Sequence, residues 1–237
     1  MEEKFSELRT EGISLTSVQK IIKRSGFTWQ KVCTRGKLLE EEEIKDQRQA
    51  VSEKFLKLTI AKKKFIFIDE VWFSEKLLPK SAYSRPHPSP KKGLNVVCAI
   101  SSEGLIGAQI FEGGLAGEDY ACFLISLLAA NPDIIGNLSN WRFFMDNCGI
   151  HKKKSISRFL KLLPIFYNAP YSPFLNPIEN IFGICKYSFR FRQLRTPKDK
   201  IANILESFKS ITPNAFKKTV RRAFKYMKKC FNREAIE

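Results

Sequence analysis

Three acidic residues stand in segments that suggest shared chemistry. Asp69 and Asp146 each end a short apolar run, and Glu179 lies in the proline-containing segment 171–180. Carboxylate oxygens are the ligands that hard divalent cations prefer, so three carboxylates together can hold Mg²⁺, with Mn²⁺ as a substitute. Two such ions about 3.5–4 Å apart can activate an attacking oxygen and stabilise a leaving oxygen in phosphoryl transfer. The sequence therefore predicts a two-ion site formed by Asp69, Asp146 and Glu179.

Each carboxylate also fits a plainer role when it is considered alone. An Asp after a strand commonly caps a turn or a helix, and Glu179 fits the exposed face of a helix. The joint placement of the three residues favours a shared site. Three clustered carboxylates would repel one another without a cation, which gives metal binding a strong driving force.

The elements that must position these side chains follow one another as strand, hairpin, helix, strand, helix, strand and helix. Apolar runs and turn residues predict strands at 65–68, 94–100, 105–111, 143–145 and 165–167. Apolar residues at helical spacing predict helices at 118–130, 155–163, 176–188, 198–209 and 213–232. This order is typical of an α/β fold of the RNase H-like kind, a mixed sheet flanked by helices. In such a sheet the first strand and the next central strand are neighbours, so Asp69 and Asp146 would face each other with Glu179 above them.

The charge of the chain indicates its partner. The 41 Lys and Arg residues exceed the 24 Asp and Glu residues by 17, and residues 180–237 alone hold 15 Lys and Arg against 4 Asp and Glu. A surplus of this size favours a polyanion, nucleic acid before membrane. No apolar run reaches the ~18 residues of a membrane span. The six cysteines show no Cys-x-x-Cys spacing, so we expect reduced thiols and an intracellular compartment.

The N-terminal segment suggests a small DNA-binding element. Residues 12–26 predict an amphipathic helix, and the β-branched run before Gly36 predicts a short hairpin. Helix and hairpin together are typical of the last helix and wing of a winged helix-turn-helix. A helix that merely packs on the next domain explains the pattern equally well. The candidate DNA-binding residues of this element are Lys20, Lys23, Arg24, Arg35 and Lys37.

The domain organisation that we predict has three parts. Residues 1–37 form a partial winged helix-turn-helix, residues 38–60 form a helical linker with a solvated acidic start, and residues 61–237 form the RNase H-like domain with basic C-terminal helices.

Three motifs resemble those of the mariner superfamily of DDE transposases. They are Asp-Glu at 69–70, Asp-Asn-x-x-x-His at 146–151 and Tyr-Ser-Pro-x-Leu-Asn-Pro-Ile-Glu-Asn at 171–180. The resemblance covers residues 61–190 well and extends more loosely to 12–37. It departs from the family in two respects: the 32 residues between Asp146 and Glu179 are slightly fewer than usual, and only about 60 residues precede the catalytic domain.

The resemblance implies a function. Asp69, Asp146 and Glu179 would be the catalytic metal ligands, with Asn147 and His151 beside the active site. The implied activity is cut-and-paste transposition, in which water attacks at the element ends and the freed 3′-hydroxyl attacks target DNA. The implied partners are double-stranded DNA and a second copy of the chain in a homodimer. The implied location is the nucleus of a eukaryotic cell, or the nucleoid in the cytoplasm otherwise.

Two other functions remain open from the sequence. One is a truncated or domesticated transposase-derived protein that binds DNA without cutting it. The other is a different RNase H-like enzyme, such as an RNA–DNA hybrid nuclease, which typically assembles four carboxylates.

Overall fold

The computed structural model describes residues 42–73, 93–149, 154–195 and 199–236, together with Ser17, Lys20 and Arg24. The chain divides into two compact units, Met1–Lys37 and Leu38–Glu237. In the smaller unit, Ser17, Lys20 and Arg24 are helical and exposed. The remaining candidates of the predicted winged element (Lys23, Arg35 and Lys37) lie outside the described residues, so that element stays a prediction.

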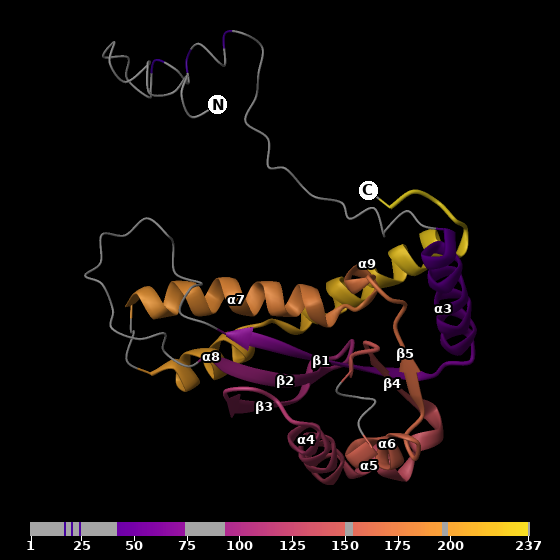
Figure 1. Ribbon diagram of the computed structural model, residues 1–237, viewed down its shortest axis with the longest axis horizontal. Coiled ribbons are helices and arrows are strands. Elements are labelled where there is room, and N and C mark those ends of the chain that lie inside the picture. The colour runs from indigo at the N-terminus through magenta and orange to yellow at the C-terminus, as the bar shows by residue number, and fades with distance from the viewer. Residues whose placement is uncertain are drawn as a thin grey trace. The chain divides into compact units, whose positions relative to one another are not determined.

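The larger unit is built on a five-stranded mixed sheet (Figure 1). The strands are β1 Lys64–Phe73, β2 Leu94–Ile100, β3 Leu105–Glu112, β4 Trp141–Met145 and β5 Ile165–Tyr167. Their order across the sheet is β3-β2-β1-β4-β5. The β1–β2 and β2–β3 pairs are antiparallel, and the β1–β4 and β4–β5 pairs are parallel. As predicted, the first strand and the next central strand are neighbours.

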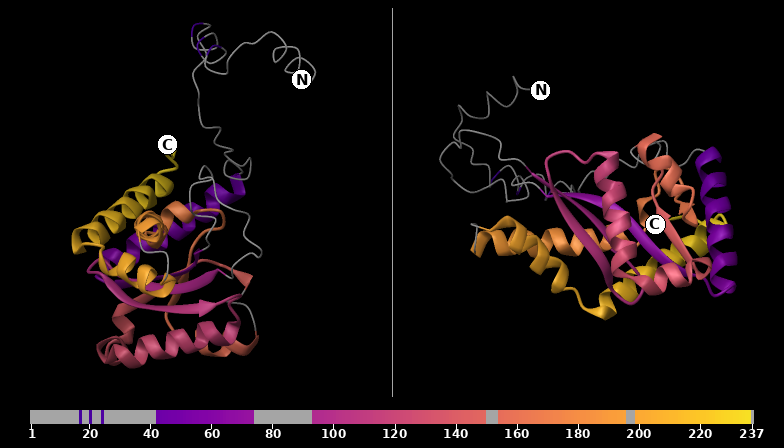
Figure 2. Two further views of the ribbon diagram at one scale, coloured as in Figure 1. Left: turned by 90° about the vertical axis from the view of Figure 1, so that its left-hand side faces the viewer. Right: turned by 90° about the horizontal axis from the view of Figure 1, so that it is seen from below.

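Helices cover both faces of the sheet (Figure 2). One face carries α4 Gly117–Ala130, α5 Pro132–Gly136 and α6 Lys154–Leu160. The other carries α3 Glu42–Ile60, α7 Ile178–Arg195, α8 Lys200–Lys209 and α9 Pro213–Phe231. Two short 3₁₀ turns, η3 Leu138–Asn140 and η5 Pro173–Leu175, complete the described elements. This arrangement confirms the predicted RNase H-like fold.

The side chains of β1 alternate between two hydrophobic cores. Ile66 and Ile68 pack with the α4 and α6 side chains, whereas Phe67 and Val71 pack with those of α7, α8 and α9. Both faces of the strand are therefore buried, which explains its continuous apolar run. Asp69 shares the face of Phe67 and Val71 because side chains two residues apart point the same way.

The helix predicted as a linker is a packed part of the larger unit. Phe55 of α3 is buried, and its ring stacks on Phe65 with 4.3 Å between ring centroids. Its ring also lies within 6.4 Å of Phe144, Phe166 and Phe224. The boundary that we predicted at residue 61 therefore cuts through a hydrophobic core.

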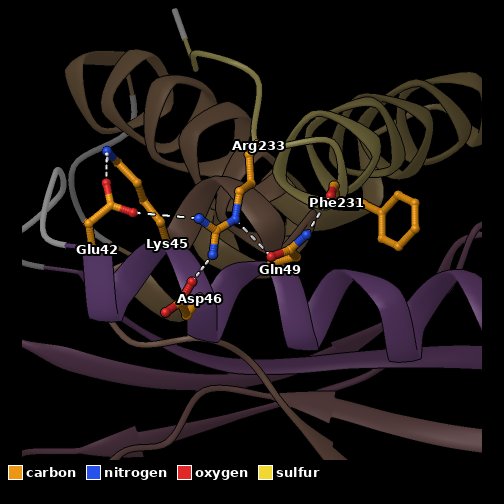
Figure 3. A network of polar contacts seen from close by, with 6 residues as sticks. All are labelled: Glu42, Lys45, Asp46, Gln49, Phe231 and Arg233. Carbon is orange, nitrogen blue, oxygen red and sulfur yellow. Dashed lines mark hydrogen bonds and ion pairs between the residues drawn. The ribbon is translucent and has the colours of Figure 1, made fainter.

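A polar network fastens the end of α9 to the start of α3 (Figure 3). Arg233 forms ion pairs with Glu42 and Asp46, and its Nε donates to Gln49 Oε1 at 2.9 Å. Gln49 Nε2 in turn donates to the Phe231 carbonyl oxygen at 3.0 Å. Exposed ion pairs add little stability individually, so the buried contacts of α3 must contribute most of the free energy that holds this helix against the sheet and α9.

Some element boundaries differ from the prediction. Asp69 does not end its strand, because β2 pairs with β1 from Phe67 as far as Phe73. Helix α7 runs on to Arg195 instead of ending at 188, and α6 ends at Leu160 instead of 163. No helix in the described part of the chain is both long and apolar enough to cross a membrane.

Candidate active site

The sheet register brings the first two carboxylates together. Phe67 of β1 lies opposite Phe144 of the parallel strand β4, which ends one residue later at Met145. Two residues further along each chain stand Asp69 and Asp146. The two carboxylates therefore meet at the point where β4 ends while β1 continues along β2.

Asp69 is buried and held by two hydrogen-bond donors. The Asn176 side-chain Nδ2 donates to Asp69 Oδ2 at 3.1 Å, and the Glu70 backbone N–H donates to Oδ1 at 2.8 Å. Asn176 is itself 1% exposed, and its Oδ1 has no hydrogen-bond partner among the described residues. These contacts fix the orientation of the Asp69 carboxylate.

Asp146 occupies the turn that follows β4. Its Oδ1 accepts a hydrogen bond from the Cys148 backbone N–H at 3.2 Å. Asn147 is exposed and lines the same pocket as Asp146. His151, the other predicted neighbour, lies outside the described residues.

Glu179 arrives from a separate part of the chain. The 3₁₀ turn η5 and Pro177 precede α7, which begins at Ile178. Glu179 is therefore the second residue of this helix. The Asn176 backbone N–H donates to the Pro173 carbonyl oxygen at 2.9 Å, which closes this turn. The prolines thus stop helix formation before the carboxylate, as predicted.

All three predicted carboxylates line one cavity of about 380 Å³. Its wall is formed by Asp69, Asp146, Asn147, Cys148, Asn176, Glu179 and the segment 168–173. The structure therefore brings together the acidic residues that the sequence singled out. Lys20 and Arg24 belong to the other unit.

Glu70 is a carboxylate of this site that the sequence reasoning missed. One carboxylate oxygen from each of Asp69, Glu70 and Asp146 lies within 4.8 Å of the other two. The alternation of β1 directs Glu70 toward the α4 face, where burial and then the charge of Glu70 raise the pKa of the Tyr120 hydroxyl. The adjacent acidic residues at 69–70 could have indicated that Glu70 belongs to the site. Neighbouring residues of a strand point to opposite faces of the sheet, however, so the pattern predicts that only one of them faces the site.

The electrostatics of the cluster favour a cation. Burial, followed by repulsion from Asp146, raises the pKa of Asp69 to about 8 and that of Glu70 to about 7. Burial also raises the pKa of Glu179, against the opposing attraction of Lys186. The cluster must therefore bind either protons or a cation near neutral pH.

The donor set fits a divalent metal ion. Asp69 accepts both of its hydrogen bonds as a carboxylate and retains further lone pairs on each oxygen. The neighbouring oxygens of Glu70 and Asp146 supply the additional hard ligands that Mg²⁺ and Mn²⁺ prefer. Glu179, on the same cavity wall, adds another carboxylate.

A hydrogen-bonded turn, residues 168–173, also lines the cavity, and no sequence pattern predicted its internal contacts. The Asn168 backbone N–H donates to the Met145 carbonyl oxygen at 2.8 Å, and its Nδ2 donates to the Ser172 carbonyl oxygen at 2.8 Å. Buried Arg48 of α3 donates from Nε to Ser172 Oγ at 2.8 Å. The turn is thereby tied to β4 on one side and to α3 on the other.

Comparison with solved structures shows where this fold occurs. The Mos1 mariner paired end complex with Mn aligns with a TM-score of 0.67 and 18% identity over 97% of this chain and 74% of that chain. The pre-cleavage Mos1 transpososome aligns with a TM-score of 0.66 and 17% identity over the same shares. The catalytic domain of Mos1 mariner transposase aligns with a TM-score of 0.63 and 16% identity over 89% of this chain and all of that one. At these identities the likeness shows a common fold.

Comparison with sequences identifies the family. No curated protein matches the chain. The family described as DDE superfamily endonuclease matches residues 64–200, a span that contains Asp69, Glu70, Asp146 and Glu179. This match covers more than half of the chain, and the protein therefore belongs to the DDE superfamily of endonucleases.

Proposed function

We propose that this protein is a DNA transposase that cleaves and joins DNA strands through a metal site formed by Asp69, Asp146 and Glu179. The observation that carries the proposal is the shared cavity: three carboxylates from β1, the end of β4 and the start of α7 line it together. Membership of the DDE endonuclease family and the fold of the Mos1 mariner complexes support it.

The cofactor that fits is Mg²⁺ or Mn²⁺, and the Mos1 mariner paired end complex has been solved with each of these metals. Divalent ions in such a site supply Lewis-acid activation of the attacking oxygen and charge stabilisation of the leaving oxygen. Two ions per site are part of the proposal. Asp69, Asp146 and Glu179 would hold them, and Glu70 would add negative charge from the neighbouring face of β1.

The protein's own side chains have clear tasks in this proposal. Asn176 and the Glu70 backbone N–H fix the Asp69 carboxylate, so its oxygens need little reorganisation before a ligand binds. The N-terminal position of Glu179 on α7 places its charge at the positive end of the helix dipole. Lys186 on the same helix offsets part of the repulsion that Glu179 meets from Asp146.

The substrate proposed is double-stranded DNA, at transposon ends and at the target. Mos1 structures include a paired-end complex with a left transposon end and a strand transfer complex. By the same likeness we propose a homodimer that holds two ends, and the nucleus or nucleoid as its place of action. The surplus of 17 cations supports a polyanionic substrate.

A strand-joining assay tests the proposal. Full-length protein is incubated with Mg²⁺ or Mn²⁺, a short duplex with a free 3′-hydroxyl and a supercoiled plasmid. We expect joined products from the wild type, and a loss of more than about 100-fold in Asp146→Asn and in Glu179→Gln, because losing a ligand should cost more than losing a residue that only supports one.

The matched control is Asp133→Asn, which makes the same chemical change at an exposed position on α5 outside the cavity. This variant should join DNA at the wild-type rate. A wild type that binds the DNA but joins no strands with either metal would contradict the proposal. It would favour a transposase-derived protein that binds DNA without cutting it.

A second candidate function rests on Glu70. It brings the number of carboxylates near the site to four, the number expected above for an RNA–DNA hybrid nuclease. Cleavage of a hybrid in preference to duplex DNA, together with loss of that cleavage in Glu70→Gln, would favour this candidate over the transposase.

A further inference from the structure

Tyr171 adopts a backbone conformation that side chains of its size rarely take. Its φ is +50°, in the left-handed region that normally favours glycine. Its side chain is nevertheless 59% exposed, so packing of the ring into a core does not hold it there. Strained residues of this kind persist where the surrounding structure over-determines them, and they concentrate at functional sites.

The residues around Tyr171 account for the strained conformation. Asn168 spans the turn through its bond to the Ser172 carbonyl oxygen, and Ser172 Oγ donates back to the Pro170 carbonyl oxygen at 2.8 Å. Asn168 and Ser172 are 7% and 2% exposed, and buried Arg48 donates to Ser172 Oγ. Tyr171 is therefore the tip of a rigid turn whose flanks are fixed on both sides.

The residues that line the cavity are of two chemical kinds. Asp69, Asp146 and Glu179 contribute carboxylates, and the turn contributes Pro170, Tyr171 and Pro173. Among the described residues that line the cavity, Tyr171 is the only aromatic one, and none is Lys or Arg. The turn thus contributes an aromatic ring and no cation for a phosphate, which suits a nucleobase.

We infer that Tyr171 is a substrate-positioning residue whose ring stacks on an unpaired base of the DNA strand that enters the carboxylate site. An unpaired base is required because a base inside a duplex has no free face. The cavity of about 380 Å³ is large enough for one such unit beside the carboxylates. This inference rests on the proposed function, since it takes the substrate to be DNA.

The test combines variants of Tyr171 with changes in the DNA. The probe is a fluorescent duplex with a short unpaired 3′ extension, bound to the full-length protein in Mg²⁺ and followed by anisotropy. A series of probes carries one abasic site at each unpaired position in turn. The variants are Tyr171→Phe, Tyr171→Ala and Tyr171→Gly, and the control is Tyr187→Ala, an exposed tyrosine on α7 outside the cavity.

At one position of the extension, the wild type should bind the intact probe about 5- to 100-fold more tightly than the abasic probe, as expected for one aromatic–base stack. Tyr171→Ala and Tyr171→Gly should bind both probes equally, whereas Tyr171→Phe and Tyr187→Ala should keep the discrimination. This double-mutant cycle isolates the contact between ring and base from general effects of phosphate binding.

Comparing Tyr171→Ala with Tyr171→Gly distinguishes the effect of losing the ring from the effect of destabilising the fold. Both variants lack the ring, but glycine accepts the positive φ and alanine does not, so the thermal midpoint of Tyr171→Gly should exceed that of Tyr171→Ala by about 2–4 °C. Equal loss of base discrimination in the two variants despite this difference would support stacking.

Two results would overturn the inference. One is base discrimination that persists in Tyr171→Ala at every position, and the other is an equal loss in Tyr171→Phe, which would assign the effect to the hydroxyl. Strand joining is measured on the same proteins. Joining that depends on Asp146 without any base discrimination would remove this inference and leave the proposed function standing. Base discrimination by the wild type without any joining would remove the proposed strand transfer and leave the contact between Tyr171 and a DNA base standing.

Discussion

At the scale of single residues, the buried carboxylates of the acidic site destabilise the fold unless they bind protons or a cation. Asp69 is buried beside Asp146 and Glu70, and no described Lys or Arg lines the cavity. Placing like charges together out of water costs free energy unless a proton or a cation joins them. The site therefore couples the stability of the protein to pH and to divalent ions.

The stability of the metal-free protein should decrease as pH rises. The pKa of Asp69 is raised from its ordinary value of 3.8 to about 8, so the folded state binds more protons than the unfolded state between these values. The free energy of unfolding must then fall through that window, by at most about 6 kcal/mol for this residue. Denaturant titrations in EDTA at pH 5 and pH 8 measure the difference.

The Asp69→Asn variant provides the control for this prediction. It removes one titrating group, so the decrease should become smaller while the part due to the raised pKa of Glu70 remains. Mg²⁺ or Mn²⁺ should also stabilise the wild type at pH 8 much more than the variant. A wild type whose stability is the same at both pH values would contradict the raised pKa. Asp133→Asn should behave as the wild type does.

At the scale of elements, α9 combines attachment and exposed charge. Its buried face includes Phe216, Ala223 and Met227. Its exposed or half-exposed cations are Lys217, Lys218, Arg221, Arg222, Lys225, Lys228 and Lys229. The helix contains no Asp or Glu, and in the described part of the chain none of its cations forms an ion pair. This surface suits a phosphate backbone.

Replacing Lys217, Arg221 and Lys225 with Gln should weaken DNA binding and make it less sensitive to salt. These residues are four apart and share one face of α9, and each lost phosphate contact should reduce the slope of log K against log salt by about 0.9. The matched control is the Gln triple variant of Lys45, Lys57 and Lys209, which already form ion pairs with Glu residues. An unchanged slope in the α9 variant would place the DNA contacts elsewhere.

The elements also show what the sequence alone could predict. The apolar runs identified β4 and β5, which are short strands with buried Phe residues at their centres. The length of β1 could not be predicted, because its second half is stabilised by antiparallel pairing with β2, across the connection 74–93. The motifs located Asp69, Asp146 and Glu179, but the contribution of Glu70 depends on how the sheet places two adjacent side chains.

Helix α3 was misjudged for a specific physical reason. Its buried face includes Arg48 and Ser52, which in the sequence are typical of a solvated surface. Arg48 donates to Ser172 Oγ, and Ser52 Oγ donates to Met227 Sδ at 3.6 Å. These partners lie more than 100 residues away, and no local pattern can reveal them.

At the scale of the whole molecule, the catalytic unit should require α3. A fragment of residues 38–237 should fold, whereas a fragment of residues 61–237 should not unfold cooperatively. Truncating a single buried Phe costs about 3–5 kcal/mol, and losing all of α3 also removes Ile44 and the Arg48 contact from a protein whose total stability is of the order of 5–15 kcal/mol. Circular dichroism during heating distinguishes the two fragments.

Phe55→Ala in the full-length chain provides a milder version of the same test. It should lower the free energy of unfolding by about 3–5 kcal/mol, because the Phe55 ring contacts four other Phe rings. A fragment of residues 61–237 with the thermal midpoint of the longer fragment would show instead that α3 is a linker.

The pairing of β5 with β4 has a consequence for how such a chain can diverge. After the turn at Asp146 the chain leaves the sheet through α6, and it returns when Ile165 aligns with Phe143 and Asn168 bonds to Met145. The pairing of β5 with β4 therefore fixes the position of the chain before Glu179, whatever the length of the segment that connects the two strands. Insertions and deletions between β4 and β5 are therefore tolerated by the geometry, whereas a single residue added between Asn168 and Glu179 would displace the last carboxylate. The count of residues between the second and third carboxylates is thus free to drift among relatives without any change in the chemistry.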